Sequence, residues 1–264
     1  MEHSAVEVDP VDIHPVDINR GAAPPAATTV AAVLAVKNLH RAKSRLAATL
    51  STASEGDDPT TRGSLVLAMF LDTVAALRGA GVTRIVVVSP DDEVLATARR
   101  SDIHGLPEAP AGSSTTSGLN AAFGYGARWA HETWQESTDL LFVQADLPAA
   151  TSASFIEVLR ETPHHRSGFV TDRDGTGTVL LHGSLLHKSL LQGAADPHGS
   201  PVLDWTPRFG PDSAAAHRAA GAVELDPGRR RWADLRTDVD TATDLAAAHE
   251  LGLGAHTIEA LRHL

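Results

Sequence analysis

The residues best suited to catalysis are carboxylates that follow two predicted strands. Asp146 comes after the buried run DLLFVQ, and Asp238 and Asp240 lie in RTDVD, after a short predicted strand and directly before a helix. The chain has no cysteine, and its 14 histidines form no HExxH motif or other obvious ligand pair. Carboxylates without such partners favour a hard cation such as Mg²⁺. The alternative for Asp146 alone is an N-cap of the following helix.

A second group of candidates is basic. The segment VKNLHRAKSRLA follows the first predicted strand and contains Lys37, Arg41, Lys43 and Arg45, in a chain whose formal net charge is −11. Such residues can form a solvated surface turn, but phosphates bind at this junction in nucleotide-binding sheets. Neither GxGxxG nor a Walker lysine motif is present, so a dinucleotide site or a P-loop is not expected. The charged side chains of this segment would have to bind the phosphates that backbone N–H groups bind in those glycine-rich loops.

The stretch TDRDGTGTVLL, residues 171–181, is a turn rich in glycine and threonine that leads into an apolar run. Hydroxyls and exposed backbone N–H groups in such a turn can satisfy phosphate and carboxylate oxygens. The same composition is also typical of an ordinary hairpin loop. The residues alone leave both interpretations open.

Hydrophobic patterning predicts the elements that position these residues. Strands that alternate with helices at short intervals predict a mostly parallel, doubly wound α/β sheet, which binds ligands at the carboxyl ends of its strands. Thr241, with Asp244 three residues later, predicts a capping box at the start of a helix. The expected strands are 30–37, 84–89, 139–144, 167–172 and 179–183, the expected helices are 65–81, 118–130, 152–161, 240–252 and one starting near Asp91, and 54–63 is expected to be a loop.

Composition limits the domains and the partners. Residues 1–28 combine repeated VD segments, prolines and acidic side chains, which predicts a disordered acidic tail before a single domain, 29–264. The net charge of −11 disfavours nucleic acid. The apolar runs are too short to span a membrane, and the N-terminus does not read as a secretory signal. The lack of cysteine fits a reducing cytoplasm, and a homodimer is compatible with the sequence.

Together, a basic loop, two carboxylate sites and a Gly-Thr turn describe a nucleotidyltransferase. The chain resembles the guanylyltransferases of coenzyme F-420 biosynthesis, which activate phosphoenolpyruvate or 2-phospho-L-lactate with GTP. The segments that carry the resemblance are VKNLHRAKSRL, LVLAMFLDT, GLNAA, ADLPA, FVTDRDGTGTVLL, PRFGPDSAAAHRAAGA and RTDVDTATDL. The resemblance implies a Rossmann-like, glycosyltransferase-A-like nucleotidyltransferase fold. The chain differs from the family at Ala145, where the family usually has glycine, and at 187–206, where its connection is longer than expected.

The resemblance implies roles for individual residues. Thr178, Gly210 and Ser213 would hold the phospho-acid, and Asp146 and Asp238 would bind two Mg²⁺ ions, with Asp240 as a further ligand. The nucleotide would be bound by residues of the basic loop and by two residues near the base, namely Lys37, Lys43, Arg45, Ser89 and Asn120. Lys43 would act in catalysis with the two aspartates. The chain is most similar in its alanine-rich composition to the actinobacterial-looking members of the family, and this resemblance implies phosphoenolpyruvate rather than 2-phospho-L-lactate or 3-phosphoglycerate as the acceptor.

Two other functions remain open. A sugar-phosphate or molybdenum-cofactor nucleotidyltransferase would share the basic loop and Asp146, but not the combination of DRDGTGT with RFGPDS. A non-catalytic nucleotide-binding regulator would have lost at least one carboxylate site, and both are present here.

Overall fold

The structure, a computed structural model, describes residues 29–37, 39, 59–108, 118–185 and 206–263. The predicted tail at 1–28 therefore lies outside the described residues.

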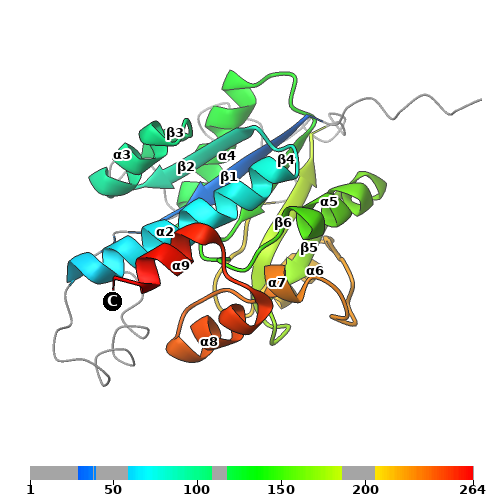
Figure 1. Ribbon diagram of the computed structural model, residues 1–264. Helices are drawn as coiled ribbons and strands as arrows, with labels where there is room; N and C mark the ends of the chain where they lie inside the picture. The colour runs from blue at the N-terminus through cyan, green and yellow to red at the C-terminus, as the bar shows by residue number, and fades with distance from the viewer. Residues whose placement is uncertain (1–28, 38, 40–58, 109–117, 186–205, 264) are drawn as a thin grey trace, which may run out of the picture.

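The described residues form one seven-stranded sheet, in the order β3-β2-β1-β4-β6-β5-β7 (Figure 1). The sixth strand in the chain runs antiparallel to both of its neighbours, and the other pairs are parallel. The predicted mostly parallel α/β sheet is thus confirmed. The strands are β1 (Val30–Ala35), β2 (Arg84–Ser89), β3 (His104–Pro107), β4 (Asp139–Val143), β5 (Ser167–Thr171), β6 (Thr178–Ser184) and β7 (Val223–Glu224).

Helices cover both faces of the sheet (Figure 1). Because side chains alternate along a strand, Ala32 and Leu34 of β1 join one apolar core, and Ala31 and Val33 join the other. No described helix is long and apolar enough to cross a lipid bilayer. The helices are α2 (Pro59–Gly79), α3 (Asp92–Arg100), α4 (Leu119–Thr133), α5 (Ser152–Glu161), a 3-10 turn (Thr162–His164), α6 (Ser213–Ala219), α7 (Ala233–Arg236), α8 (Ala242–Leu251) and α9 (Ala255–Leu261).

Two sequence predictions of local structure are wrong. Helix α2 begins at Pro59, so residues 59–63 are helical and not part of a loop. Proline is tolerated there because the first turn of a helix needs no N–H donor. The segment before Asp238 forms the single helical turn α7 and not a strand. Four residues are too few for their hydrophobic period to distinguish a helix from a strand.

Candidate active site

The two predicted carboxylate segments lie side by side. Asp146 follows β4, and its backbone carbonyl accepts a hydrogen bond from the N–H of Val239 at 3.1 Å. Val239 stands between Asp238 and Asp240, so this bond joins two segments that are 93 residues apart in sequence. Among the described residues, no group of three or more Asp, Glu or His side chains is arranged to hold a metal ion alone.

The segment that carries Asp146 is fixed by helix α2. The hydroxyl of Thr73, which is fully buried, accepts a hydrogen bond from Leu147 N at 3.2 Å and lies 3.0 Å from Met69 O. The predicted alternative role of Asp146 as a helix cap is wrong, because Thr151 caps α5 by accepting from Ser154 N. Sequence reasoning missed Thr73, although a threonine within an apolar helix face is a usable signal.

The capping box predicted for α8 is confirmed. The Thr241 side chain accepts from Asp244 N, and the Asp244 carboxylate accepts from Thr241 N at 2.9 Å. The same carboxylate accepts from Asp240 N at 3.3 Å. The backbone that carries Asp240 is therefore fixed to the start of the helix, while Asp240 itself is exposed.

The Gly-Thr turn connects β5 to β6 and is organised by its own aspartate. The Asp172 carboxylate accepts from Thr176 N at 2.9 Å and from Gly177 N at 2.7 Å. A Cβ atom at Gly177 would lie 2.3 Å from the Asp172 carboxylate, so the close approach requires glycine. Two backbone N–H groups of the turn are therefore already used within the hairpin.

His217 joins the turn to the PRFGPDS segment. Its Nδ1 lies 2.9 Å from Thr178 Oγ1, and its Nε2 accepts from Arg208 N at 3.0 Å. Since Nε2 accepts, the neutral ring carries its hydrogen on Nδ1 and donates to Thr178, whose own hydroxyl hydrogen can then bond elsewhere. The N–H of Ala214 also donates to Thr176 O at 3.0 Å. These contacts bring together the two predicted acceptor motifs.

The other two predicted acceptor residues lie at the start of α6. Gly210 is exposed and has a φ of 131°, a conformation that favours glycine. Ser213 is the first residue of the helix and is buried. Their predicted contact with a phospho-acid stays a prediction.

The pH response of His217 can be predicted from its surroundings. Burial, and next the charge of Arg208, lower the pKa of His217 from 6.5 to about 4. Between pH 6.5 and about 4 the imidazole of His217 is protonated in the unfolded chain but not in the folded chain. The neutral, buried His217 therefore contributes stability to the folded state above pH 6.5, and this contribution is lost as the pH falls toward 4. We expect the melting temperature to fall as the pH falls through this window, and to fall less steeply in His217→Gln. An NMR titration of the ring with a midpoint near 6.5 would contradict this.

The predicted base-binding residues lie in internal contacts. The Asn120 side-chain amide of α4 donates to Phe209 O at 2.8 Å and accepts from Phe209 N at 2.7 Å, which orients the PRFG segment. Ser89 is fully buried, and its hydroxyl accepts from Asp91 N at 3.1 Å. Contacts of either residue with a guanine base stay predictions.

The predicted phosphate loop is described only in part. Lys37 is exposed and lies two residues after the end of β1, whereas Arg41, Lys43 and Arg45 lie outside the described residues. The Asp91 carboxylate accepts from Leu39 N at 2.9 Å, so the turn after β2 holds the beginning of this loop.

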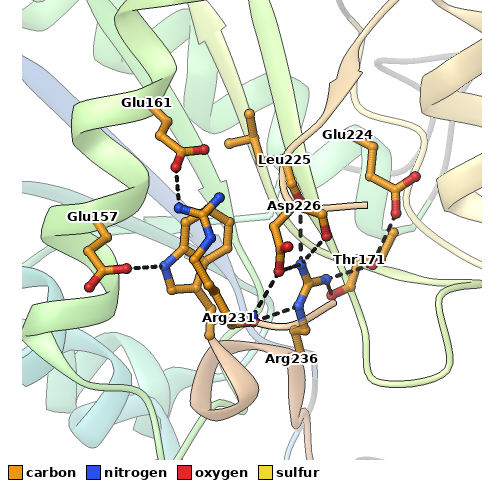
Figure 2. A network of polar contacts seen from close by, with 9 residues as sticks. Glu157, Glu161, Thr171, Glu224, Leu225, Asp226, Arg231 and Arg236 are labelled. Atoms are coloured by element: carbon orange, nitrogen blue, oxygen red, sulfur yellow. Dashed lines mark hydrogen bonds and ion pairs between the residues drawn. The ribbon is translucent and has the colours of Figure 1, made fainter. Parts of the chain in front are cut away.

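Arg236 is a buried hub that sequence patterns did not indicate (Figure 2). Its guanidinium donates to Thr171 O at 2.8 Å, to Thr171 Oγ1 at 2.7 Å and to Asp226 O at 3.0 Å. Its Nε donates to Arg231 O at 3.0 Å. Its own backbone carbonyl accepts from Arg173 N at 2.8 Å. Through its side chain and its backbone carbonyl together, Arg236 thus ties the end of β5 and the Gly-Thr turn to the segment that leads to the second carboxylate site.

The fold and the arrangement of the site define a nucleotidyltransferase. The family model of the MobA-like NTP transferase domain matches residues 63–209. A nucleotidyl transferase from Methanothermobacter thermautotroptrophicus shares the fold, with a TM-score of 0.53 and 18% identity over 84% of this chain and 97% of that chain. The nucleotidyltransferase fold predicted from the sequence is confirmed.

Sequence relatives identify the family within this class. The phosphoenolpyruvate guanylyltransferase of Nocardia farcinica is 42% identical over 236 residues, which cover 89% of this chain and 92% of the relative. That of Mycolicibacterium gilvum is 39% identical over 244 residues, covering 92% and 98%. The chain belongs to the phosphoenolpyruvate guanylyltransferase family, and the resemblance found in its motifs is confirmed.

Proposed function

We propose that this enzyme transfers GMP from GTP to the phosphate of phosphoenolpyruvate and releases pyrophosphate, as a step of coenzyme F-420 biosynthesis. The observation that carries the proposal is the convergence of the acceptor and carboxylate motifs. Gln144, just after β4, donates its N–H to Val179 O at 2.9 Å, so the start of β6 adjoins the segment that leads to Asp146. The Gly-Thr turn and the carboxylates therefore occupy neighbouring positions along one edge of the sheet.

The reaction needs little acid–base chemistry from the protein. The second pKa of a phosphate monoester is about 6, so the acceptor is largely dianionic at neutral pH and is itself the nucleophile. One of its phosphate oxygens forms a bond to the α-phosphorus of GTP. The bond from that phosphorus to the α,β-bridging oxygen breaks, and this oxygen leaves with the pyrophosphate. The enzyme must bring two polyanions together and stabilise negative charge at the reacting phosphorus.

Residues of the acceptor motifs and of the basic loop supply these functions. Thr178, Gly210 and Ser213 hold the phospho-acid. The basic loop, Lys37, Lys43 and Arg45, neutralises the triphosphate and the leaving pyrophosphate.

Asp146 and Asp238 hold Mg²⁺, with Asp240 as a further ligand. Protein sites for this ion commonly use one or two carboxylates together with substrate phosphates, so the two adjoining segments fit it without a third protein ligand. When bound, two such ions would offset the charge that develops on the phosphate oxygens. The bond from Val239 N to Asp146 O holds the backbones of the two segments together.

A substrate panel tests the proposal. Pyrophosphate release would be measured with GTP, ATP and CTP, each paired with phosphoenolpyruvate, 2-phospho-L-lactate, 3-phosphoglycerate or glucose 1-phosphate. The products would be identified by mass spectrometry. We expect the fastest turnover with GTP and phosphoenolpyruvate. Turnover with a sugar phosphate only, or none with any phospho-carboxylic acid, would contradict the proposal.

Thr178→Val tests the acceptor site. Removing a hydroxyl that donates to a charged oxygen costs about 1.5–3 kcal/mol, so the KM for phosphoenolpyruvate should rise by roughly ten- to a hundredfold. The KM for GTP should change little. Valine suits a strand, but the Nδ1–H of His217 loses its partner, so a melting temperature lower by a few degrees is also expected.

The two KM values and the melting temperature of Thr178→Val together separate the possible roles of the hydroxyl. A lower melting temperature with both KM values unchanged would make Thr178 purely structural. A higher KM for GTP alone would place the Gly-Thr turn at the nucleotide.

A further inference from the structure

The turn after β7 places an arginine against the Gly-Thr turn. A Cβ atom built on Gly175 would lie 2.0 Å from Arg229 Nη1 and 2.9 Å from its Cζ. The guanidinium therefore packs on the backbone of Gly175, whose φ of 79° already favours glycine. Because β7 runs parallel to β5, the turn that follows it emerges at the same edge of the sheet as the Gly-Thr turn.

Arg229 is exposed and carries a charge that no described carboxylate balances. Two nearby arginines differ in this respect: Arg173 pairs with Asp244 at 3.0 Å, and Arg236 pairs with Asp226 at 3.3 Å. Burial lowers the pKa of Arg236, and the charge of Arg229 lowers it further, against the opposite effect of Asp226. Among the described residues, the turn thus holds a cation that has no carboxylate within ion-pair distance.

The backbone of this turn is strained and firmly anchored. Arg229 has a φ of 50°, a left-handed conformation that non-glycine residues rarely adopt. Asp226 holds it in place: its carbonyl accepts from Arg229 N at 2.9 Å and from the buried Arg236 at 3.0 Å. Figure 2 shows the Asp226 carboxylate between Arg236 and the backbone of Arg231, which donates at 2.9 Å. Strain of this kind is kept where surrounding contacts fix it, often at binding sites.

We propose that Arg229 binds the carboxylate of the phospho-carboxylic acid and makes the acceptor site selective for acids over neutral phosphate esters. The assignment rests on the proposed function, in which Thr178, Gly210 and Ser213 hold the acceptor beside this turn. A guanidinium presents a planar pair of N–H donors that matches a carboxylate. Its packing on Gly175 places the guanidinium beside the turn that leads into β6 at Thr178.

Arg229→Ala tests the proposal, with Arg230→Ala as the matched control. Both arginines are exposed and adjacent in sequence, but the Arg230 side chain lies near Gly228, whereas the Arg229 side chain lies against Gly175. We expect the KM for phosphoenolpyruvate to rise about tenfold or more in Arg229→Ala, with the KM for GTP within about twofold, and both constants to stay near wild-type values in Arg230→Ala. Arg229→Lys should recover part of the loss, because it restores the charge without the planar fork.

A competition experiment identifies the group that Arg229 reads. 3-Phosphoglycerate and glycerol 3-phosphate carry the same phosphate ester and differ in the carboxylate. As competitors of phosphoenolpyruvate, the acid should inhibit the wild-type enzyme more strongly, and this preference should disappear in Arg229→Ala. Equal inhibition of the wild-type enzyme by the two esters would overturn the assignment.

Other outcomes separate the two proposals. If Arg229→Ala and Arg230→Ala have the same KM values, or if only the KM for GTP rises, the assignment of Arg229 is wrong while the proposed function stands. If the wild-type enzyme does not use phosphoenolpyruvate with GTP, the proposed function fails, and the role of Arg229 fails with it.

Discussion

Replacing Asp146 or Asp238 with alanine is expected to reduce pyrophosphate release by roughly a thousandfold or more. Metal ions supply several kcal/mol of charge stabilisation in phosphoryl transfer, and these carboxylates would hold them. Both side chains lie in loops at the sheet edge and are only partly buried. The melting temperature should therefore stay close to that of the wild-type enzyme. Turnover at saturating GTP and phosphoenolpyruvate, measured over a range of Mg²⁺ concentrations, gives the result.

Asp174→Ala is the control for these two variants. Asp174 is an exposed carboxylate of the Gly-Thr turn, and its closest ion pair, with Arg173, is a loose one at 4.0 Å. Turnover should be nearly unchanged. Near-native turnover in Asp146→Ala or Asp238→Ala would show that the metal assignment is wrong at that position.

Arg236→Met is expected to destabilise the fold by about 3–5 kcal/mol, which is the usual cost of breaking a buried ion pair from one side. The residue is 2% exposed, and the substitution removes its hydrogen bonds to Thr171 O and Asp226 O. Methionine fills a similar volume, so the missing hydrogen bonds and not a cavity would dominate. Urea unfolding followed by circular dichroism measures the change.

Arg231→Ala provides the comparison for Arg236→Met. Arg231 belongs to the same turn but pairs with Glu161 at the surface. Exposed ion pairs contribute about 0–1 kcal/mol, so a small effect is expected. Equal losses in the two variants would show that Arg236 does not hold the turn more strongly than its exposed neighbour does.

The sequence predicted the sheet because its central strands are continuous apolar runs. RIVVVS and DLLFV were placed correctly, as were the helices that follow them. Strand β3 was missed because HGLP contains glycine and proline, which are rare in strands, and β7 has only two residues. Edge strands such as these form through pairing with a neighbour and not through their own propensity.

The candidate site was predicted in part for a similar reason. Asp146 stands at the end of a strong strand, where local sequence shows its position. The role of Arg236 depends on Thr171, which is 65 residues away, and on the backbone of a turn. No local period records contacts of this kind. The contact between His217 and Thr178 likewise joins two residues that are 39 positions apart in the sequence.

The antiparallel strand in the middle of the sheet bears on how the chain is made. β6 pairs with β4 through residues 180–184, which are synthesised after β1, β2 and β4. Until then β4 is an exposed edge with the fully apolar core sequence LLFV, and unpaired edges of this kind attract other chains. A shortened protein that ends after α5 would keep this edge permanently. We therefore expect the second half of the chain to protect the first from aggregation, in addition to carrying the predicted acceptor motifs.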